Sequence, residues 1–171
     1  MDFKKYIKDI PDFPKKGIIF KDISPLLANP EALREIIKNI CDKYRKNPPD
    51  KIVGLDARGF IFGAIVAYEL KTGFIMSRKP DKLPDKTISQ KYSLEYGDNT
   101  FEIHSNSIKP GEKILILDDL LATGGSVGAV IKLVEKLGGE VIGIECIIEL
   151  AFLKGREKLS KYSINSQIIY E

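Results

Sequence analysis

Short apolar runs alternate with helical stripes along most of the chain. Apolar residues dominate 51–55, 74–77, 114–117 and 141–148, a pattern typical of strands buried on both faces of a sheet. Between these runs, apolar residues recur every three or four positions, as on the buried face of a helix. Strand–helix–strand units repeat at roughly the 30-residue scale of βαβ connections. The pattern predicts an α/β fold with an open, mostly parallel sheet flanked by helices.

Prolines and glycines mark where the predicted helices begin and end. Asn29 and Pro30 supply an N-cap and a proline at the first helical position, and an Asn-Pro-Pro stretch at 47–49 ends that helix. A stripe at 127–137 predicts a second helix, closed by two glycines. Residues 60–70 are apolar nearly all round, which predicts a buried helix rather than a surface one.

The remaining segments show weaker patterns. Residues 3–10 have the apolar spacing of a short helix, whereas 12–27, interrupted by prolines, are expected to be extended with turns. Residues 92–104 alternate like a hairpin whose turn is the Gly-Asp-Asn at 97–99. A last, more exposed strand is expected at 162–170.

Size and composition limit the classes of protein to which the chain can belong. Its 171 residues, 43% hydrophobic and 30% charged, suit one well-cored globular domain. No run approaches the roughly 18 apolar residues of a membrane span, and the N-terminus lacks the apolar core of a secretory signal. Cys41 and Cys146 are interpreted as reduced core thiols of a cytoplasmic protein. His104 is the only histidine, which excludes a histidine-based metal site or a Ser-His triad.

The net charge of +3 is concentrated in one segment. Residues 78–91 carry five Lys or Arg against two Asp, so the rest of the chain is formally neutral. A nucleic-acid-binding protein normally spreads its basic residues over a face or helix, so no nucleic-acid partner is expected. Such a segment suits either a solvated surface loop or a flexible arm that contacts a small polyanion.

The segment 113–126 (KILILDDLLATGGS) carries the clearest chemical signal. An apolar run ends in Asp118 and Asp119, a Thr-Gly-Gly-Ser turn follows, and a helical stripe begins. Unpaired N–H groups at such a turn form an anion site, because the helix N-terminus is electropositive. Carboxylates beside an anion site indicate a ligand with both phosphate and hydroxyl groups, such as a sugar phosphate. The alternative is that the two acids merely cap the helix.

Two common phosphate loops do not match this segment. A P-loop needs Gly-Lys followed by Ser or Thr, and that combination is absent from the chain. A dinucleotide-binding fingerprint places its acid about 20 residues after the glycines, whereas here the acids come directly before them. Two acids, a two-residue spacer and Ala-Thr-Gly-Gly-Ser resemble instead the 5-phosphoribosyl 1-pyrophosphate signature of the type I phosphoribosyltransferase family.

Four further segments narrow the resemblance to the adenine-specific members of that family. They occur in the family's order and, with the signature, cover the chain from about residue 12 to about residue 159. They are similar to its base-binding, pyrophosphate, basic and catalytic-loop segments, and lie at 16–23 (KGIIFKDI), 56–60 (DARGF), 78–84 (RKPDKLP) and 92–97 (YSLEYG). The resemblance implies one phosphoribosyltransferase domain over 1–171. A small N-terminal hood would occupy about 1–30, and a basic segment with a mobile hairpin loop about 78–104.

The resemblance assigns donor-binding roles to several residues. Asp118 and Asp119 are expected to accept hydrogen bonds from the ribose 2′- and 3′-hydroxyls, while small residues let the backbone of the turn approach the 5′-phosphate. Arg58 is expected to hold pyrophosphate and to act in catalysis, since a cation at a helix start favours an anionic partner. A cis peptide is expected between Asp56 and Arg58. The other expected donor-binding residues are Ala122, Thr123, Gly124, Gly125, Ser126, Arg78, Lys79 and Lys82.

One position of the signature concerns the choice of base. The enzymes for 6-oxopurines carry an acid at its fifth position, where this chain has Ala122. The resemblance therefore implies that Glu95 handles the purine proton, with Tyr96 covering the site when the hairpin loop closes.

The resemblance also implies an adenine-binding segment near the N-terminus. Phe20 is expected to stack on the base, and backbone groups around Ile19 and Lys21 to read its 6-amino edge. The alternative for Phe20 is ordinary core packing, the commoner role of a buried aromatic residue.

Together these residues imply a purine-salvage transferase. Adenine and 5-phosphoribosyl 1-pyrophosphate would give AMP and pyrophosphate through an oxocarbenium-like transition state, with Mg²⁺ held mainly by substrate and water. The alternatives are xanthine or hypoxanthine as the acceptor, or a non-catalytic regulator that senses the donor. The resemblance further implies a cytoplasmic homodimer that acts on small molecules and has neither nucleic-acid nor membrane partners.

Overall fold

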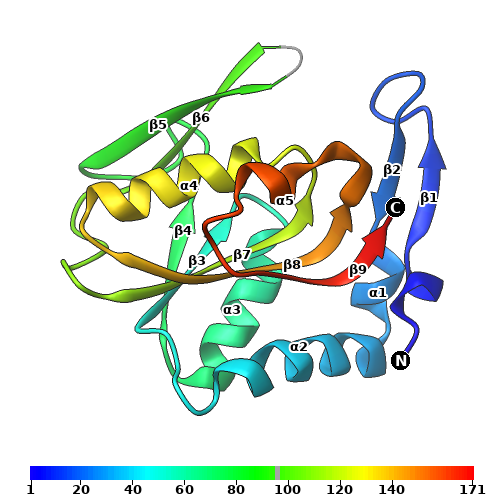
Figure 1. The fold of residues 1–171 in the computed structure, drawn as a ribbon, viewed down its shortest axis with the longest axis horizontal. Helices are drawn as coiled ribbons and strands as arrows, with labels where there is room; N and C mark the ends of the chain where they lie inside the picture. The colour runs from blue at the N-terminus through cyan, green and yellow to red at the C-terminus, as the bar shows by residue number, and fades with distance from the viewer. Residues whose placement is uncertain (95–96) are drawn as a thin grey trace.

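A parallel sheet of five strands forms the centre of the protein (Figure 1). The computed structural model describes residues 1–94 and 97–171. The strands of the sheet, in spatial order, are β4 (Gly73–Ser77), β3 (Lys51–Leu55), β7 (Lys113–Leu121), β8 (Glu140–Leu150) and β9 (Ile164–Tyr170). Each neighbouring pair is parallel, which confirms the predicted sheet.

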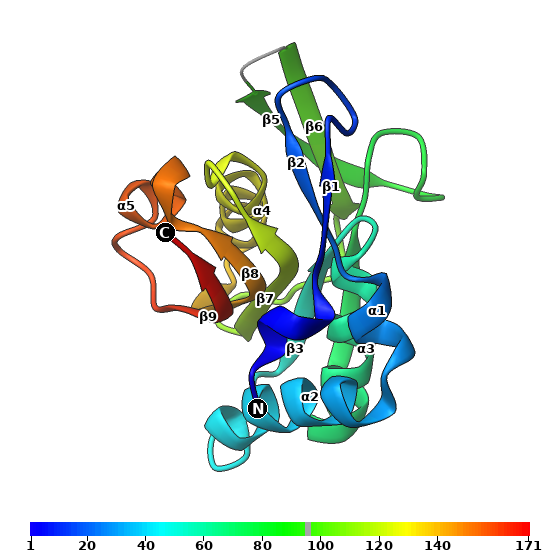
Figure 2. The ribbon, with the colours of Figure 1, turned by 90° about the vertical axis from the view of Figure 1, so that its right-hand side faces the viewer.

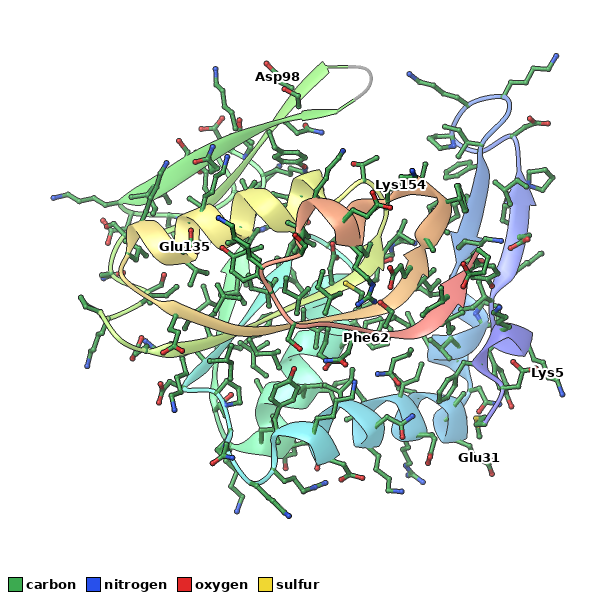
Figure 3. All side chains as sticks on the ribbon, viewed as in Figure 1. Lys5, Glu31, Phe62, Asp98, Glu135 and Lys154 are labelled. Carbon is green, nitrogen blue, oxygen red and sulfur yellow. The ribbon has the colours of Figure 1, made fainter. Side chains whose placement is uncertain are left out.

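Helices cover both faces of the sheet (Figure 1). α2 (Pro30–Tyr44) and α3 (Gly59–Leu70) lie on one face, and α4 (Gly125–Lys136) lies on the other. α2 starts as predicted, because the Asn29 side chain accepts a hydrogen bond from the third helical N–H at 2.9 Å. Phe62, labelled in Figure 3, is fully buried in the core on the α3 side.

Strand β7 contributes to both cores. Ile114 and Ile116 pack with α4, whereas Leu115 and Leu117 pack with α2 and α3. Because successive side chains of a strand point to opposite faces, a strand covered on both sides must be apolar at every position. This burial explains why the sequence shows a continuous apolar run there rather than an alternation.

The winding of the chain reverses between the adjacent strands β3 and β7. β3 leads through α3 to β4 on one side, and β7 leads through α4 to β8 on the other. Ligands of open α/β sheets bind at the carboxyl ends of the strands beside such a reversal. Gly59, just after β3, lies so close to β7 that a Cβ atom would be 2.8 Å from the carbonyl oxygen of Leu117. The turn that follows β3 therefore lies against the carboxyl-terminal half of β7.

Two antiparallel hairpins stand apart from the main sheet (Figure 2). β1 (Lys8–Pro11) pairs with β2 (Ile19–Asp22), and β5 (Thr87–Leu94) pairs with β6 (Gly97–His104). Both hairpins project beyond the sheet toward the top of Figures 1 and 2.

One prediction for the N-terminal region was wrong, and a second was correct only in part. Residues 3–10 form only a 3₁₀ turn, η1 (Phe3–Tyr6), before β1 begins, because pairing with β2 outweighs the weak helical spacing. The segment 12–27, expected to be extended with turns, is extended at β2, but its last residues belong to the short helix α1 (Ser24–Ala28). Its Pro25 lies in the first helical turn, where a missing N–H costs nothing.

Two other boundaries and the burial of one helix also differ from the predictions. β7 does not end at Leu117 but continues to Leu121, since its pairing with β8 continues. The predicted turn at 97–99 lies within β6, where Asp98 pairs with Ser93. α3 is not buried all round, because Tyr68 on its outer face is 82% exposed.

The thiols of Cys41 and Cys146 are both buried and free, as predicted. Burial raises the pKa of Cys41 to about 11. Among residues 1–94 and 97–171, the helices fall short of the length and hydropathy that a membrane span requires.

Candidate active site

A cavity of about 270 Å³ opens at the carboxyl ends of β3 and β7. Its walls come from the turn after β3, from the end of β7 with the turn that follows, and from the start of α4. Most of the predicted donor-binding residues line it, namely Arg58, Lys79, Asp118, Asp119, Ala122, Thr123, Gly124, Gly125 and Ser126. Tertiary structure thus brings together side chains that are up to 68 positions apart in the chain.

Two adjacent carboxylates form the most unusual wall of this cavity. Asp118 and Asp119 are only 9% and 6% exposed. Asp118 Oδ1 accepts a hydrogen bond from the N–H of Asp119 at 2.9 Å. Asp119 Oδ2 lies 2.8 Å from Nη2 of Arg58 but receives no well-directed hydrogen bond. A buried carboxylate oxygen that lacks a full set of partners is ready to accept a hydroxyl from a ligand.

The burial of these acids changes their titration. Desolvation raises the pKa of Asp118 well above its ordinary value, and the neighbouring charge of Asp119 adds to the rise. Desolvation also raises the pKa of Asp119, although the positive charge of Arg58 opposes it. The ionised forms are therefore costly to hold at this position without a compensating cation or ligand.

The turn after β3 connects this pair to the N-terminal hairpin. Its Asp56–Ala57 peptide bond is cis, as predicted. The guanidinium carbon of Arg58 lies 4.9 Å from the centroid of the Phe20 ring, a cation–π contact. The single side chain of Arg58 thus touches both an acid of the cavity wall and the aromatic residue predicted to stack on a base.

The turn between β7 and α4 has the geometry of an anion site. Gly124 has a φ of +80°, in the left-handed region that favours glycine, and precedes the first residue of α4. No side chain caps this helix start, so the first N–H groups of α4 remain available for an anion.

The predicted basic residues do not all reach the cavity. Lys79 lines it, with Nζ 2.7 Å from the Tyr92 hydroxyl and 4.3 Å from the centroid of the Phe101 ring. Arg78 instead donates from Nε to Asp56 at 3.1 Å and from Nη1 to the carbonyl oxygen of Lys82 at 3.1 Å.

Arg78 is thus held by Asp56 and by the backbone of Lys82, outside the lining of the cavity, and Lys82 itself is exposed. Neither Arg78 nor Lys82 lines the cavity.

The predicted adenine-binding residues lie on two faces of β2. Phe20 faces Arg58, whereas Ile19 and Lys21 line a second, mostly apolar cavity of about 550 Å³ between this hairpin and the carboxyl ends of β8 and β9. The Lys21 ammonium pairs with Asp9 at 2.7 Å. The predicted catalytic residues Glu95 and Tyr96 lie outside the described residues, so their roles stay predictions.

Comparison with known proteins assigns the chain to a family. A family model described as "Phosphoribosyl transferase domain" matches residues 22–169. An adenine phosphoribosyltransferase from Halothermothrix orenii is 56% identical over 164 residues, which are 96% of each chain. The chain belongs to the adenine phosphoribosyltransferases of the phosphoribosyltransferase family.

Solved structures agree with this membership. The crystal structure of adenine phosphoribosyltransferase from Thermoanaerobacter pseudethanolicus is 48% identical, has a TM-score of 0.95, and covers 99% of this chain and 98% of its own. The enzyme from Saccharomyces cerevisiae is 37% identical, has a TM-score of 0.91, and covers 97% and 96%. That structure was solved in complex with D-2,5-dideoxy-2,5-imino-altritol 1,6-bisphosphate and adenine.

The sequence analysis did not identify several residues that line or adjoin the cavity. Leu55, Leu120 and Phe101 line the cavity, and Gly155 lies directly behind its anion-binding turn. Gly155 follows the carboxyl end of β8, the sheet edge at which ligands bind, so the strand order could have indicated it. Phe101 reaches the cavity through the placement of a separate hairpin, for which no local signal exists.

Asp118→Asn is expected to raise the thermal stability and to weaken the binding of a phosphoribosyl ligand. The native pKa of Asp118 is raised, so wild-type stability falls as pH rises from the ordinary value of 3.8 through the native pKa. A neutral amide removes that loss, and each kcal/mol gained raises the melting temperature by about 2–4 °C in a protein of this size.

Calorimetry at several pH values checks this expectation. Asp42→Asn, at an exposed position of α2, is the matched control and should leave the melting temperature within about 1 °C. A melting temperature of Asp118→Asn equal to or below that of wild type at neutral pH would contradict the destabilising burial of this acid.

Proposed function

We propose that the protein transfers the phosphoribosyl group of 5-phosphoribosyl 1-pyrophosphate to adenine, forming AMP and releasing pyrophosphate. The observation that carries the proposal is the cavity in which two buried carboxylates, one with an oxygen that receives no hydrogen bond, adjoin an uncapped helix start. A ligand with vicinal hydroxyls and a phosphate satisfies both features at once. Membership of the adenine phosphoribosyltransferases supports the same reaction.

Donor binding begins with the sugar and its 5′-phosphate. Asp118 and Asp119 accept hydrogen bonds from the 2′- and 3′-hydroxyls, which gives Asp119 Oδ2 a hydrogen bond in addition to its ion pair with Arg58. The 122–126 turn surrounds the phosphate with backbone N–H groups, and the electropositive start of α4 favours its charge.

Bond cleavage at the anomeric carbon builds positive charge on the ribose and negative charge on the departing pyrophosphate. Arg58 and Lys79, both in the cavity wall, stabilise the leaving group through charge-assisted hydrogen bonds. The buried carboxylates lie on the ribose side, where their negative charge favours the oxocarbenium-like state.

We also propose that Mg²⁺ accompanies the donor. The ion is proposed to be held mainly by substrate oxygens and water, because Mg²⁺ gives up its waters reluctantly and usually takes only one or two carboxylates from the protein. The two adjacent carboxylates of the cavity fit the one or two protein ligands that such an ion uses. When bound, the ion neutralises charge on the pyrophosphate as it departs.

The purine is proposed to lie against Phe20. Its ring already makes a cation–π contact with Arg58, so a base stacked on Phe20 would adjoin the donor cavity. Glu95 is proposed to handle the purine proton and Tyr96 to cover the site, since Ala122 leaves no acid within the anion-binding turn for that task.

A direct test is to assay adenine, hypoxanthine, guanine and xanthine in parallel with the phosphoribosyl donor and Mg²⁺. Adenine is expected to be converted to AMP at least 100-fold faster than any 6-oxopurine, and chelation of Mg²⁺ should abolish turnover. Pyrophosphate release gives the measurement. Absence of adenine turnover would overturn the proposal, and donor binding without turnover of any base would favour a ligand-sensing regulator.

Glu95→Gln tests the proposed base chemistry separately. General acid–base catalysis typically contributes 10²–10⁴-fold, so kcat is expected to fall by about that factor while the Kd for the donor changes less than threefold. Glu102→Gln, on the neighbouring strand β6, is the matched control and should retain kcat. Wild-type turnover by Glu95→Gln would remove Glu95 from the mechanism.

The chain is further proposed to form one phosphoribosyltransferase domain that acts as a cytoplasmic homodimer. Phe3 near the N-terminus and Ile168 near the C-terminus belong to the same buried cluster, which supports a single folding unit. The outer face of α3 exposes Ile61 and Tyr68, and Met76 on the edge strand β4 is 42% exposed. Large apolar side chains on adjoining elements favour burial against a second copy.

Sedimentation velocity tests the dimer. The expected mass is twice the 19.2 kDa of one chain, and Tyr68→Glu should shift the protein toward the monomer because it places a charge in the proposed interface. Lys5→Glu, an exposed change far from α3 in Figure 3, should leave the dimer intact. A wild-type protein that sediments as a 19.2 kDa species at micromolar concentration would contradict the dimer.

A further inference from the structure

The segment that follows β8 packs against the back of the anion-binding turn. It comprises the one-turn helix η2 (Ala151–Leu153), then Lys154, then α5 (Gly155–Lys158). Figure 1 shows α5 beside the first turn of α4, and Lys154, labelled in Figure 3, marks where it begins. This segment lies outside the donor cavity, so direct contact with the donor does not account for its placement.

Within this segment, Gly155 lies closest to the 122–126 turn. A Cβ atom at this position would overlap the carbonyl oxygen of Ala122 and lie 2.9 Å from the amide nitrogen of Gly124. Conversely, a Cβ atom at Gly124 would lie 2.9 Å from the carbonyl oxygen of Gly155. The two backbones therefore touch, and neither position has room for a side chain.

The two glycines are required for different reasons. Gly124 has a φ of +80°, so its conformation as well as the lack of space favours glycine. Gly155 is not among the positive-φ glycines, so only the close approach to the turn requires glycine there. Substitution at Gly155 consequently probes the contact itself without imposing backbone strain within α5.

A bidentate ion pair holds α5 in this position. Arg156 Nε donates to Glu149 Oε1 at 2.9 Å, and its Nη2 pairs with the other oxygen of the same carboxylate. Arg156 Nη1 donates to the carbonyl oxygen of Ile164 at 2.7 Å, and the Ser166 hydroxyl donates to Glu149 Oε2 at 2.6 Å. One guanidinium therefore ties α5 to β8 and β9 together.

This pair is built to resist displacement. The Glu149 side chain is only 4% exposed, so its charge depends on the hydrogen bonds that Arg156 and Ser166 supply. Those hydrogen bonds lower the pKa of Glu149, with Arg156 as the main cause. At the other end of the segment, the buried Leu159 reaches to 3.6 Å from where a Cβ atom of Gly128 on α4 would be.

We propose that Arg156 and Glu149 are positioning residues for the phosphoribosyl donor, which act by holding Gly155 against the 122–126 turn. The inference rests on the proposed function, since it takes the 5′-phosphate as the ligand of the turn. An anion site made of backbone N–H groups works only if those groups converge on one point. A rigid backing by a second backbone prevents the turn from relaxing away from the phosphate.

The test uses ligands that contact different parts of the cavity. Gly155→Ala is expected to raise the Kd for ribose 5-phosphate, measured by calorimetry, at least tenfold. The Kd for pyrophosphate should stay within twofold, because Arg58 and Lys79 do not depend on the turn. In turnover, KM for the donor should rise at least tenfold while KM for adenine stays within twofold.

Substitutions in the ion pair make the test independent of that one glycine. Arg156→Gln should raise the Kd for ribose 5-phosphate about three- to tenfold. Arg156→Lys should give an intermediate value, since an ammonium keeps the charge but loses the bidentate geometry. Glu149→Gln preserves the shape of the side chain, and it takes the place of Gly155→Ala in the test if that variant does not fold.

Matched controls define what would overturn the proposal. Gly128→Ala adds the same methyl group on α4 where its nearest neighbour is at an ordinary 3.6 Å, and Arg45→Gln removes an exposed Arg–Asp pair on α2. Both controls should bind ribose 5-phosphate as wild type does. Variants of the pair that lose melting temperature but keep wild-type Kd for ribose 5-phosphate would overturn the positioning role. The role would also be overturned if the Kd for pyrophosphate rose in these variants as much as the Kd for ribose 5-phosphate. Neither result would affect adenine turnover by wild type, on which the proposed function depends.

Discussion

The burial of two adjacent carboxylates at the end of β7 is the constraint around which the active site is organised. Taking Asp118 and Asp119 out of water is costly, and the cost shows in their raised pKa values. Arg58 compensates part of it from the neighbouring turn, at 2.8 Å. That turn can bring Arg58 so close because β3 and β7 are neighbours in the sheet and because the small Gly59 lets the turn lie directly against β7. A site that stores such a cost favours ligand binding at the expense of stability.

The second feature of the site is a backbone held by another backbone. The glycines of the 122–126 turn would let its N–H groups surround the proposed phosphate, but small residues alone would leave the turn free to change its conformation. Gly155 closes the space behind it, and the Arg156–Glu149 pair connects that support to the sheet. In this arrangement the rigid sheet, rather than the loop itself, determines the geometry of the anion site.

Local sequence signals predicted the central elements well and the peripheral ones poorly. β3 has the predicted limits and α2 the predicted start, because full burial or a capped amphipathic stripe leaves one stable choice. The N-terminal region was wrong because β1 gains its hydrogen bonds from β2, a partner that the spacing of residues 3–10 cannot reveal. The prediction that α3 is buried on all sides was wrong for a related reason. An all-apolar helix indicates burial without saying whether its own chain or a second copy covers it.

The sequence by itself determined the chemistry of the site, whereas only the tertiary structure decided its geometry. The acids-before-glycines order after a buried strand predicts a sugar-phosphate ligand, because strand, turn and helix start are contiguous in the chain. Three features of the site instead join segments that are distant in the chain. Arg58 contacts both Asp119 and Phe20. Arg78 pairs with Asp56, and Gly155 packs on the 122–126 turn. Such contacts depend on which strands neighbour one another in the sheet. Strand order is set by the packing of whole helices on both faces, so no local pattern of residues contains it.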